Sequence, residues 1–147
     1  MLKIDKRLKQ EIESHGIAAY PYEGCGLLLG RQVKGGNGRI DNVVTSLFPV
    51  ANSWEVEEEK RERFLIAPQD MLQAELTAAS QGLDIVGIFH SHPDHPPIAS
   101  PRDVAWAAWP GHSYLITEIR QGQSKQSRSW QLLPDRSGFE EEEVQFM

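Results

Sequence analysis

The sequence predicts an α/β fold in which a mixed β-sheet is flanked by helices. Short apolar segments rich in Val, Ile, Leu and Phe have the length and composition of β-strands. Other segments repeat apolar residues at three- and four-residue spacing, which is typical of amphipathic helices. The two kinds of segment alternate along the chain, so the strands are expected to form a mixed sheet with helices packed against it.

The N-terminal segment predicts a helix followed by a loop. Ile4, Leu8 and Ile12 recur at four-residue spacing, with charged residues between them. Gly16 is expected to end this helix. Residues 20–24, Tyr-Pro-Tyr-Glu-Gly, have the composition of a loop.

The next segments predict two paired strands and a polar connection. Residues 25–30 form a short apolar run bounded by glycines, which favours a buried strand. The glycine cluster at 34–38 favours a turn, and residues 39–50 have the composition of the partner strand. Residues 52–63 are polar and are expected to form a surface loop, whereas residues 64–67 predict a further strand.

A second helix is predicted over residues 68–81. Met71, Leu72, Leu76 and Ala79 fall on one side of such a helix. The glycine that follows the segment is a typical helix end.

The second half of the chain predicts three strands and one helix. Residues 84–92 have high β propensity, and residues 93–99 are too rich in proline for a helix or a central strand. Residues 100–109 predict a helix that is closed by Pro-Gly. The last two strands are predicted at 113–119 and 129–133, joined by a polar turn.

Composition limits the classes of protein and partner. With 147 residues and no repeat or linker, residues 1–147 are expected to form a single domain. The single cysteine, Cys25, excludes an intramolecular disulfide. A formal charge of −6 argues against a general nucleic-acid binder, and the acidic runs at 55–59 and 140–143 are expected to be solvated. The charged N-terminus and short apolar runs argue against a signal peptide and a membrane span, so we expect a cytoplasmic protein.

The segment with the clearest chemical content is Gly-Ile-Phe-His-Ser-His-Pro at 87–93, together with Asp103. Residues two apart on a strand point to the same face, so His90 and His92 can offer two imidazoles to one ion. Asp103 lies in the first turn of the next predicted helix, from which its carboxylate can reach back. Two imidazoles and one carboxylate with an open fourth position are typical of a catalytic zinc site.

Ser100 and Asp103 also have a purely structural interpretation. Ser-Pro-x-Asp matches an N-cap serine, a proline at the first helical position and an acid at the third. The two interpretations do not exclude each other. The joint spacing of two histidines, a short stiff loop and the Ser–Asp pair favours the metal site.

This pattern resembles the JAMM, or MPN-plus, metalloprotease family. The family pattern is an upstream glutamate, then His-x-His, seven residues, Ser, two residues and Asp. The segment from His90 to Asp103 matches without a gap, because seven residues separate His92 from Ser100. Glu23, in Tyr-Glu-Gly-Cys-Gly-Leu-Leu-Leu-Gly, matches the glutamate. That phrase and the later Pro-Gly-His-Ser-Tyr-Leu-Ile are similar to the small stand-alone bacterial members, and the resemblance covers nearly the whole chain.

The resemblance implies a role for each matched residue. His90, His92 and Asp103 would hold one zinc ion per chain. Glu23 would act as the general base and would then hand its proton to the leaving amine. Ser100 would donate a hydrogen bond to the developing oxyanion.

A fold and a substrate class are also implied by the resemblance. The family fold is a mixed sheet flanked by helices, with a cytidine-deaminase-like architecture. Small bacterial members are similar to enzymes that trim or release cargo from the C-terminal Gly-Gly of ubiquitin-like sulfur-carrier proteins, for example in cysteine biosynthesis. We therefore expect a zinc-dependent hydrolase of a peptide or isopeptide bond. Its expected substrate is a ubiquitin-like or sulfur-carrier protein, and neither a nucleic acid nor a membrane is expected as a partner.

Three other interpretations remain open. His-x-His-x-Asp-His at 90–95 also matches the signature of metallo-β-lactamase-like hydrolases, in which Asp94 would bind metal. A cysteine hydrolase would use Cys25 and a histidine. A non-catalytic MPN-type module would only bind a ubiquitin-like partner.

Several residues outside the motif have weaker interpretations. Asn52, Arg61 and Arg63 lie beside the strand predicted at 64–67, where an extended substrate tail would meet them by strand addition. Trp106 and Trp109 lie three apart on the predicted helix, and both are expected to be packing residues.

Overall fold

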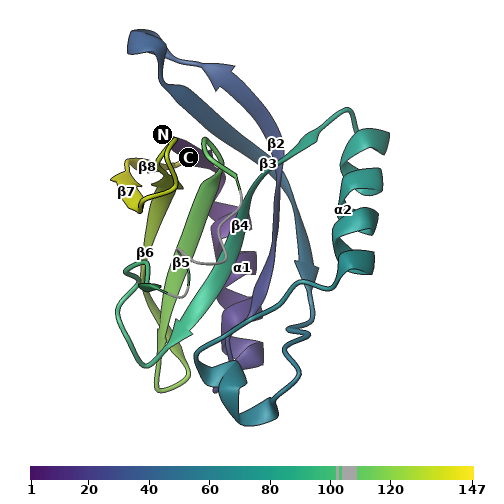
Figure 1. Ribbon diagram of the computed structural model, residues 1–147, viewed down its shortest axis with the longest axis vertical. Helices are drawn as coiled ribbons and strands as arrows, with labels where there is room; N and C mark the ends of the chain where they lie inside the picture. Colours follow the sequence, from purple (N-terminus) through teal and green to yellow (C-terminus); the bar gives the residue numbers. More distant parts are fainter. Residues whose placement is uncertain (102, 104–108) are drawn as a thin grey trace.

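The structure is a computed structural model that describes residues 1–101, 103 and 109–147. The described residues form one mixed sheet in the order β7-β6-β5-β4-β2-β3-β1-β8, with helices α1 and α2 packed against it (Figure 1). The α/β class predicted from the sequence is confirmed. The strands are β1 (Leu2–Ile4), β2 (Cys25–Lys34), β3 (Ile40–Val50), β4 (Asp84–Pro93), β5 (Ser113–Arg120), β6 (Gln123–Leu132), β7 (Phe139–Glu142) and β8 (Val144–Phe146). The helices are α1 (Lys6–Ala19) and α2 (Pro68–Ser80), with short 3-10 helices η1 (Gly36–Gly38) and η2 (Glu57–Arg61).

Strand β4 lies in the middle of the sheet. It pairs antiparallel with β2 on one edge and parallel with β5 on the other. Strand β2 also pairs antiparallel with β3, and β1 lies parallel to both β3 and β8. Because both edges of β4 are hydrogen bonded, its C-terminal end is a rigid support for side chains.

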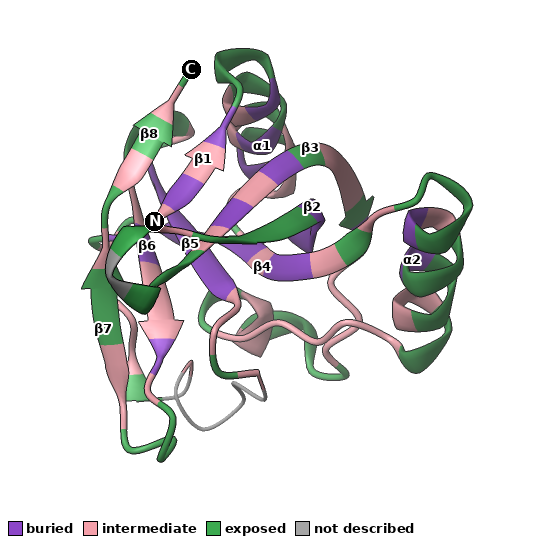
Figure 2. Ribbon diagram, turned by 90° about the horizontal axis from the view of Figure 1, so that it is seen from above, coloured by how far each residue is buried: buried purple, intermediate pink, exposed green. Residues whose placement is uncertain are grey.

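The two helices cover opposite faces of the sheet. On α1, Leu8 and Ile12 pack with Leu28 of β2 and with further residues of one face. On α2, Ala74 and Ala78 pack on the other face against a separate cluster that includes Leu27 and Leu29 of β2. The buried residues accordingly lie along the central strands and on the sides of α1 and α2 that face them (Figure 2).

The helix predicted at the N-terminus is confirmed, but it begins and ends at other residues than predicted. Ile4 belongs to β1, and α1 begins after the N-cap residue Asp5. Gly16 does not end the helix, which continues to Ala19. Gly16 instead lets α1 approach β5 closely, because a Cβ atom there would lie 3.1 Å from Ile119.

Helix α2 confirms the helix predicted at 68–81, and the side that faces the sheet carries small residues. Leu72 and Leu76 are 54% and 55% exposed, whereas Ala74 and Ala78 are buried. The small alanine side chains allow the helix backbone to approach the sheet, so the two leucines lie on the outer side.

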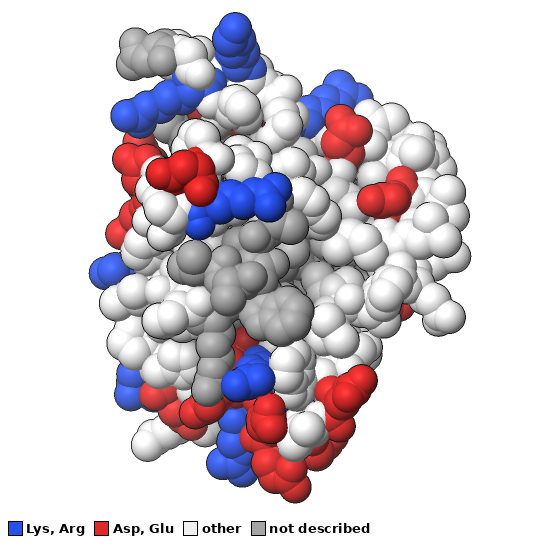
Figure 3. All heavy atoms as spheres, in the orientation of Figure 1, with Lys and Arg blue, Asp and Glu red and all other residues white. Residues whose placement is uncertain are grey.

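The connection between β3 and α2 is irregular apart from η2. The polar loop predicted at 52–63 is confirmed, and the acidic side chains of η2 gather at the lower end of the molecule in Figure 3. The strand predicted at 64–67 is wrong. Leu65 is held there by a backbone bond from Ser53 N to its carbonyl oxygen at 2.9 Å, without a neighbouring strand.

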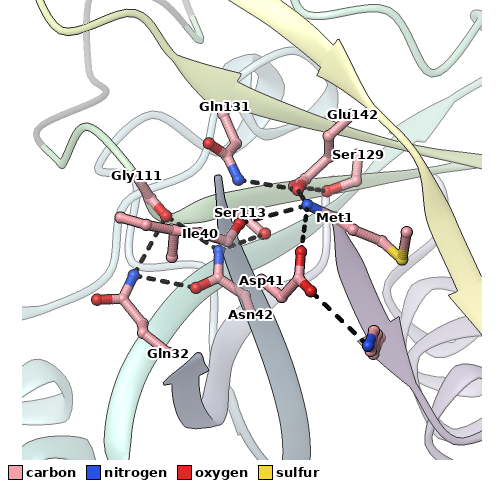
Figure 4. A network of polar contacts seen from close by, with 11 residues as sticks. Met1, Gln32, Ile40, Asp41, Asn42, Gly111, Ser113, Ser129, Gln131 and Glu142 are labelled. Atoms are coloured by element: carbon pink, nitrogen blue, oxygen red, sulfur yellow. Dashed lines mark hydrogen bonds and ion pairs between the residues drawn. The ribbon is translucent and has the colours of Figure 1, made fainter. Parts of the chain in front are cut away.

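The C-terminal segment adds β7 and β8, which the sequence did not predict. The expectation that residues 140–143 are solvated is wrong for Glu142. Its carboxylate accepts a hydrogen bond from Ser129 Oγ at 2.7 Å and lies 3.2 Å from the amino group of Met1 (Figure 4). Pairing of β7 with β6 turns this side chain inward, while Glu140 and Glu141 stay exposed.

The remaining strand predictions, at 84–92, 113–119 and 129–133, are confirmed by β4, β5 and β6, although β6 begins earlier, at Gln123. The helix predicted at 100–109 lies largely outside the described residues, of which Pro101 and Asp103 are helical. Among the described residues, neither helix combines the length and the apolar character needed to cross a membrane.

Candidate metal centre

Near its C-terminal end, strand β4 carries His90 and His92 on one face. Cys25 of β2 pairs with His90, and Glu118 of β5 pairs with His92, so both backbone positions are fixed by neighbouring strands. Both imidazoles are buried, with 2% and 1% of their surface exposed. The alternation of side chains along a strand therefore places two buried imidazoles side by side, as predicted.

A carboxylate completes this pair. The Nε2 atoms of His90 and His92 lie 3.1 Å apart. Asp103 Oδ1 lies 3.2 Å from His90 Nε2, and Asp103 Oδ2 lies 3.3 Å from His92 Nε2. Zinc bonds of about 2.0–2.1 Å at tetrahedral angles separate neighbouring ligand atoms by about 3.3 Å. The three side chains thus have the chemical identity and the spacing to hold one zinc ion.

The contacts of His92 show which form of its ring faces this centre. Its Nδ1 lies 2.8 Å from the carbonyl oxygen of Pro96, which can only accept, so Nδ1 carries the hydrogen in this contact. In the neutral ring, Nε2 is then the nitrogen that carries no hydrogen. An imidazole nitrogen without a hydrogen is the form that binds a metal ion, so the contact with Pro96 suits His92 to that role.

Ser100 fixes the carboxylate of Asp103. The backbone N–H of Ser100 donates to Asp103 Oδ2 at 2.8 Å, and the backbone N–H of Asp103 donates to Ser100 Oγ at 3.2 Å. This reciprocal pair is the capping interaction predicted from the sequence. Since the same carboxylate also faces both histidines, the capping and metal-site interpretations hold together.

The surroundings of Asp103 keep its carboxyl group ionised. Burial alone raises the pKa of Asp103, but the charge of His90, the hydrogen bonds of both histidines and the amide of Ser100 outweigh it. The net effect holds the pKa well below its usual range. The ionised carboxylate is the form that binds a metal ion.

Glu23 reaches the same centre from the loop that precedes β2. Only 2% of its surface is exposed, and its backbone N–H donates to Lys60 O at 2.7 Å. Its carboxylate lies within 4.8 Å of ring nitrogens of His92 and His95. The fold therefore brings together all five residues that the sequence singled out, although they come from separate stretches of the chain.

Comparison with protein families agrees with this geometry. The family of prokaryotic homologs of the JAB domain matches residues 5–133. The chain belongs to this family. The JAMM/MPN resemblance predicted from the sequence is thereby confirmed.

Two curated relatives have names that describe a reaction. A desampylase of Haloferax volcanii is 36% identical over 96 residues, which cover 65% of this chain and 62% of the relative. A probable TtuB-protein conjugate cleaving protease of Thermus thermophilus is 30% identical over 109 residues, which cover 74% of this chain and 65% of the relative. The match to this JAB-family chain thus spans slightly less than two thirds of either relative.

Solved structures confirm the JAB/MPN fold. The solution structure of a protein from Desulfitobacterium hafniense is 30% identical, has a TM-score of 0.81, and covers 100% of this chain and 93% of that chain. A structure described as JAMM, a metalloprotease-like zinc site in the proteasome and signalosome, is 18% identical with a TM-score of 0.56. That second match covers 100% of this chain and 98% of that chain, and it is evidence for the fold alone.

Asp94 of this JAB-family chain is engaged away from the candidate metal centre. Its Oδ2 accepts from the Tyr20 hydroxyl at 2.6 Å, and its Oδ1 accepts from the backbone N–H of Gln121 at 2.7 Å. Two sets of possible metal ligands occur among the described residues, His90–His92–Asp103 and Glu23–His92–His95, and Asp94 belongs to neither. The geometry therefore disfavours the metallo-β-lactamase-like interpretation, which requires this carboxylate as a ligand.

Cys25 lies beside the centre but is not disposed to act as a nucleophile. It is fully buried, and this burial, followed by the charges of Glu23 and Asp70, raises the pKa of its thiol to about 12. A neutral buried thiol is unreactive. The structure therefore disfavours the cysteine hydrolase interpretation.

Two aromatic rings that lie against the candidate ligands were not assigned to the site from the sequence. Phe64 stacks on His90 with ring centroids 4.6 Å apart, and His95 stacks on His92 at 4.1 Å. Phe64 was predicted to lie in a strand, and no pattern in the sequence places it next to His90. His95 lies three residues after His92 in the proline-rich loop, and this short spacing indicates that the two rings stay close together. Both rings restrict the rotation of the imidazoles they cover.

The remaining residues named from the sequence differ in their surroundings. The guanidinium of Arg63 lies over the ring of Trp54, 5.1 Å from its centroid, and Arg61 is exposed at the end of η2. Trp109 donates its backbone N–H to the hydroxyl of Tyr114 at 3.1 Å. Trp106 lies outside the described residues.

Proposed function

We propose that this protein is a zinc-dependent hydrolase that cleaves the peptide or isopeptide bond after the C-terminal Gly-Gly of a ubiquitin-like or sulfur-carrier protein. The observation that carries the proposal is the convergence of His90, His92 and Asp103 on one centre, where their ligand atoms all lie within 4.8 Å of one another. The names of the desampylase and the TtuB-protein conjugate cleaving protease support the cleavage of conjugates.

His90, His92 and Asp103 would hold the zinc ion. When bound, zinc lowers the pKa of a coordinated water molecule toward about 7 and polarises the carbonyl group of the substrate. Asp103 is suited to this role because its carboxyl group stays ionised, and His92 because Pro96 fixes its ring. The burial of both histidines excludes bulk water from the ligand side of the centre.

Glu23 would act as the general base. Its carboxylate takes the proton of the attacking water molecule and then gives it to the leaving amine. The side chain is buried and lies within 4.8 Å of ring nitrogens of His92 and His95, which supports this role. Proton transfer by a positioned side chain typically contributes about 10²–10⁴-fold in rate.

Ser100 would stabilise the oxygen atom that gains negative charge. Its Oγ accepts a hydrogen bond from the backbone N–H of Asp103, so the hydroxyl hydrogen remains available for a second group. A preorganised donor of this kind is typically worth about 10²–10³-fold in kcat.

The proposal is tested with a sulfur-carrier protein whose C-terminal Gly-Gly is joined by an amide bond to a lysine side chain. The zinc-loaded protein should release the lysine-containing peptide, and a chelator or Glu23→Gln should lower the rate by at least about 10²-fold. The matched control is Glu75→Gln on the exposed side of α2, which should leave the rate unchanged. Hydrolysis that persists in both the chelated protein and Glu23→Gln would refute the proposal. Binding of the conjugate without hydrolysis would instead favour a non-catalytic module.

A further inference from the structure

The side-chain amide of Asn52 has all of its hydrogen-bonding positions filled within the protein. Its Nδ2 donates to the carbonyl oxygens of Glu23 at 3.0 Å and Arg63 at 2.9 Å. Its Oδ1 accepts from the backbone N–H groups of Trp54 at 3.1 Å and Leu65 at 3.2 Å. An asparagine amide has two hydrogens to donate and two lone pairs to accept with, so all four are used. The sequence-based interpretation that Asn52 contacts an extended substrate is therefore not supported.

Two of these contacts bear directly on the position of Glu23. Asn52 follows the end of β3, whose Val50 pairs with Cys25 at the start of β2. Glu23 precedes β2 and lies in no strand, so its backbone is not held by a ladder of sheet bonds. The bond from Asn52 Nδ2 to its carbonyl, together with the bond from its N–H to Lys60 O, fixes the backbone that carries this carboxylate.

The other contacts of Asn52 fix the segment that covers His90. Arg63 and Leu65 flank Phe64, whose ring stacks on the imidazole of His90. This segment is irregular, so the amide of Asn52 replaces the strand pairing it lacks. One side chain thus connects the backbone of Glu23 to the aromatic ring that lies against a candidate metal ligand.

We propose that Asn52 is a positioning residue for hydrolysis, acting through the backbone of Glu23 and through Phe64. The inference rests on the proposed function, because it assigns Asn52 the task of holding the base at the candidate metal centre. Loss of the two donated bonds frees the loop before β2, and the carboxylate of Glu23 then occupies its reactive position for a smaller fraction of the time. A displacement of about 1 Å in such a group can cost about 10²-fold in rate.

The test compares Asn52→Asp and Asn52→Ala with a matched control, Asn42→Asp. Asn52→Asp removes both donors but keeps the acceptor for Trp54 and Leu65, whereas Asn52→Ala removes all four bonds. Asn42 likewise donates two bonds, to Gly111 O at 3.0 Å and Ser113 Oγ at 2.8 Å, but it lies at the other end of β3 and is buried, whereas Asn52 is half-buried (Figure 4). Its substitution reproduces the loss of donors without touching Glu23.

Both Asn52 variants should lower kcat by about tenfold to a hundredfold with little change in KM or zinc content. Asn42→Asp should keep kcat within about twofold of the wild-type value, even where it lowers the melting temperature as much as Asn52→Asp does. An equal loss of kcat in Asn42→Asp and Asn52→Asp would overturn the inference. Unchanged kcat in Asn52→Ala would overturn it as well.

Amide hydrogen exchange in the metal-free protein provides a readout that does not depend on catalysis. The N–H of Glu23 should exchange at least about tenfold faster in both Asn52 variants than in wild type, and at the wild-type rate in Asn42→Asp. The N–H groups of Trp54 and Leu65 should be affected only in Asn52→Ala. Absence of hydrolysis by the wild-type protein would refute the proposed function. Unchanged exchange at Glu23 would refute the positioning by Asn52, whatever the activity.

Discussion

If the protein holds zinc as proposed, removal of the ion should lower the melting temperature, Tm, by about 5–11 °C. His92 Nε2 lies 3.3 Å from one oxygen of the Asp103 carboxylate and His90 Nε2 lies 3.2 Å from the other, so the three groups can bind one ion only in the native state. A ligand present at about 100 times its Kd that binds only the native state stabilises it by about 2.7 kcal/mol. For a domain of this size, each kcal/mol shifts Tm by roughly 2–4 °C, which gives the expected range.

The assay is thermal unfolding of metal-free protein, with and without zinc, in wild type and two variants. His92→Ala removes one of the three candidate ligands and should reduce the zinc-dependent rise in Tm to less than about 2 °C. Asp94→Asn should keep the full rise, because Asp94 bonds to Tyr20 and Gln121 instead of facing the centre. A full rise in His92→Ala would show that zinc binds elsewhere, and loss of the rise in Asp94→Asn alone would favour the metallo-β-lactamase-like arrangement.

Two further predictions concern buried groups beside the centre. Ser91→Ala removes the hydroxyl oxygen that accepts a hydrogen bond from the Gly24 N–H at 2.8 Å. The variant should lower the free energy of unfolding, measured by urea titration, by about 1–3 kcal/mol. A smaller loss would show that this N–H finds another partner. Burial raises the pKa of Cys25 from 9.0 to about 12, so its contribution to stability is complete below about pH 9 and is lost as the pH rises toward 12. Cys25→Ala should therefore lose less stability than wild type over that pH range, and rapid alkylation of native Cys25 at pH 8 would contradict its burial.

The central strands and the site motif could be predicted because their signals are local. On β4, an apolar run leads into His90 and His92, and the two-residue period of a strand alone puts both imidazoles on one face. The three-residue spacing of Ser100 and Asp103 likewise predicts an N-terminal helix cap. The structure shows the two hydrogen bonds of this cap, from Ser100 N–H to Asp103 Oδ2 and from Asp103 N–H to Ser100 Oγ.

Other features depend on contacts that no local pattern contains. Strands β1, β7 and β8 are three or four residues long, too short for a recognisable period, and they exist because they pair with other strands. On α2, Leu72 and Leu76 have larger apolar side chains than Ala74 and Ala78, yet the two alanines are the residues buried against the sheet. The helix lies close to the sheet, and only small side chains fit between them. Phe64 lies over His90 from an irregular segment whose flanking residues bond to the side chain of Asn52, and no strand period predicts these contacts.

The proline-rich loop after β4 has a chemical role beyond ending the strand. Ring N–H groups reach the carbonyl oxygens of three of its prolines, from His95 to Pro93 at 2.7 Å, from His92 to Pro96 at 2.8 Å and from Trp130 to Pro97 at 3.1 Å. Pro97 restricts the ψ angle of Pro96, so the carbonyl oxygen that faces His92 is held in a constrained direction. In the neutral form of each histidine ring, the hydrogen therefore lies on Nδ1 and Nε2 carries none. The loop thus favours the form of His92 that the proposed zinc site requires, and Trp130 anchors the loop to β6.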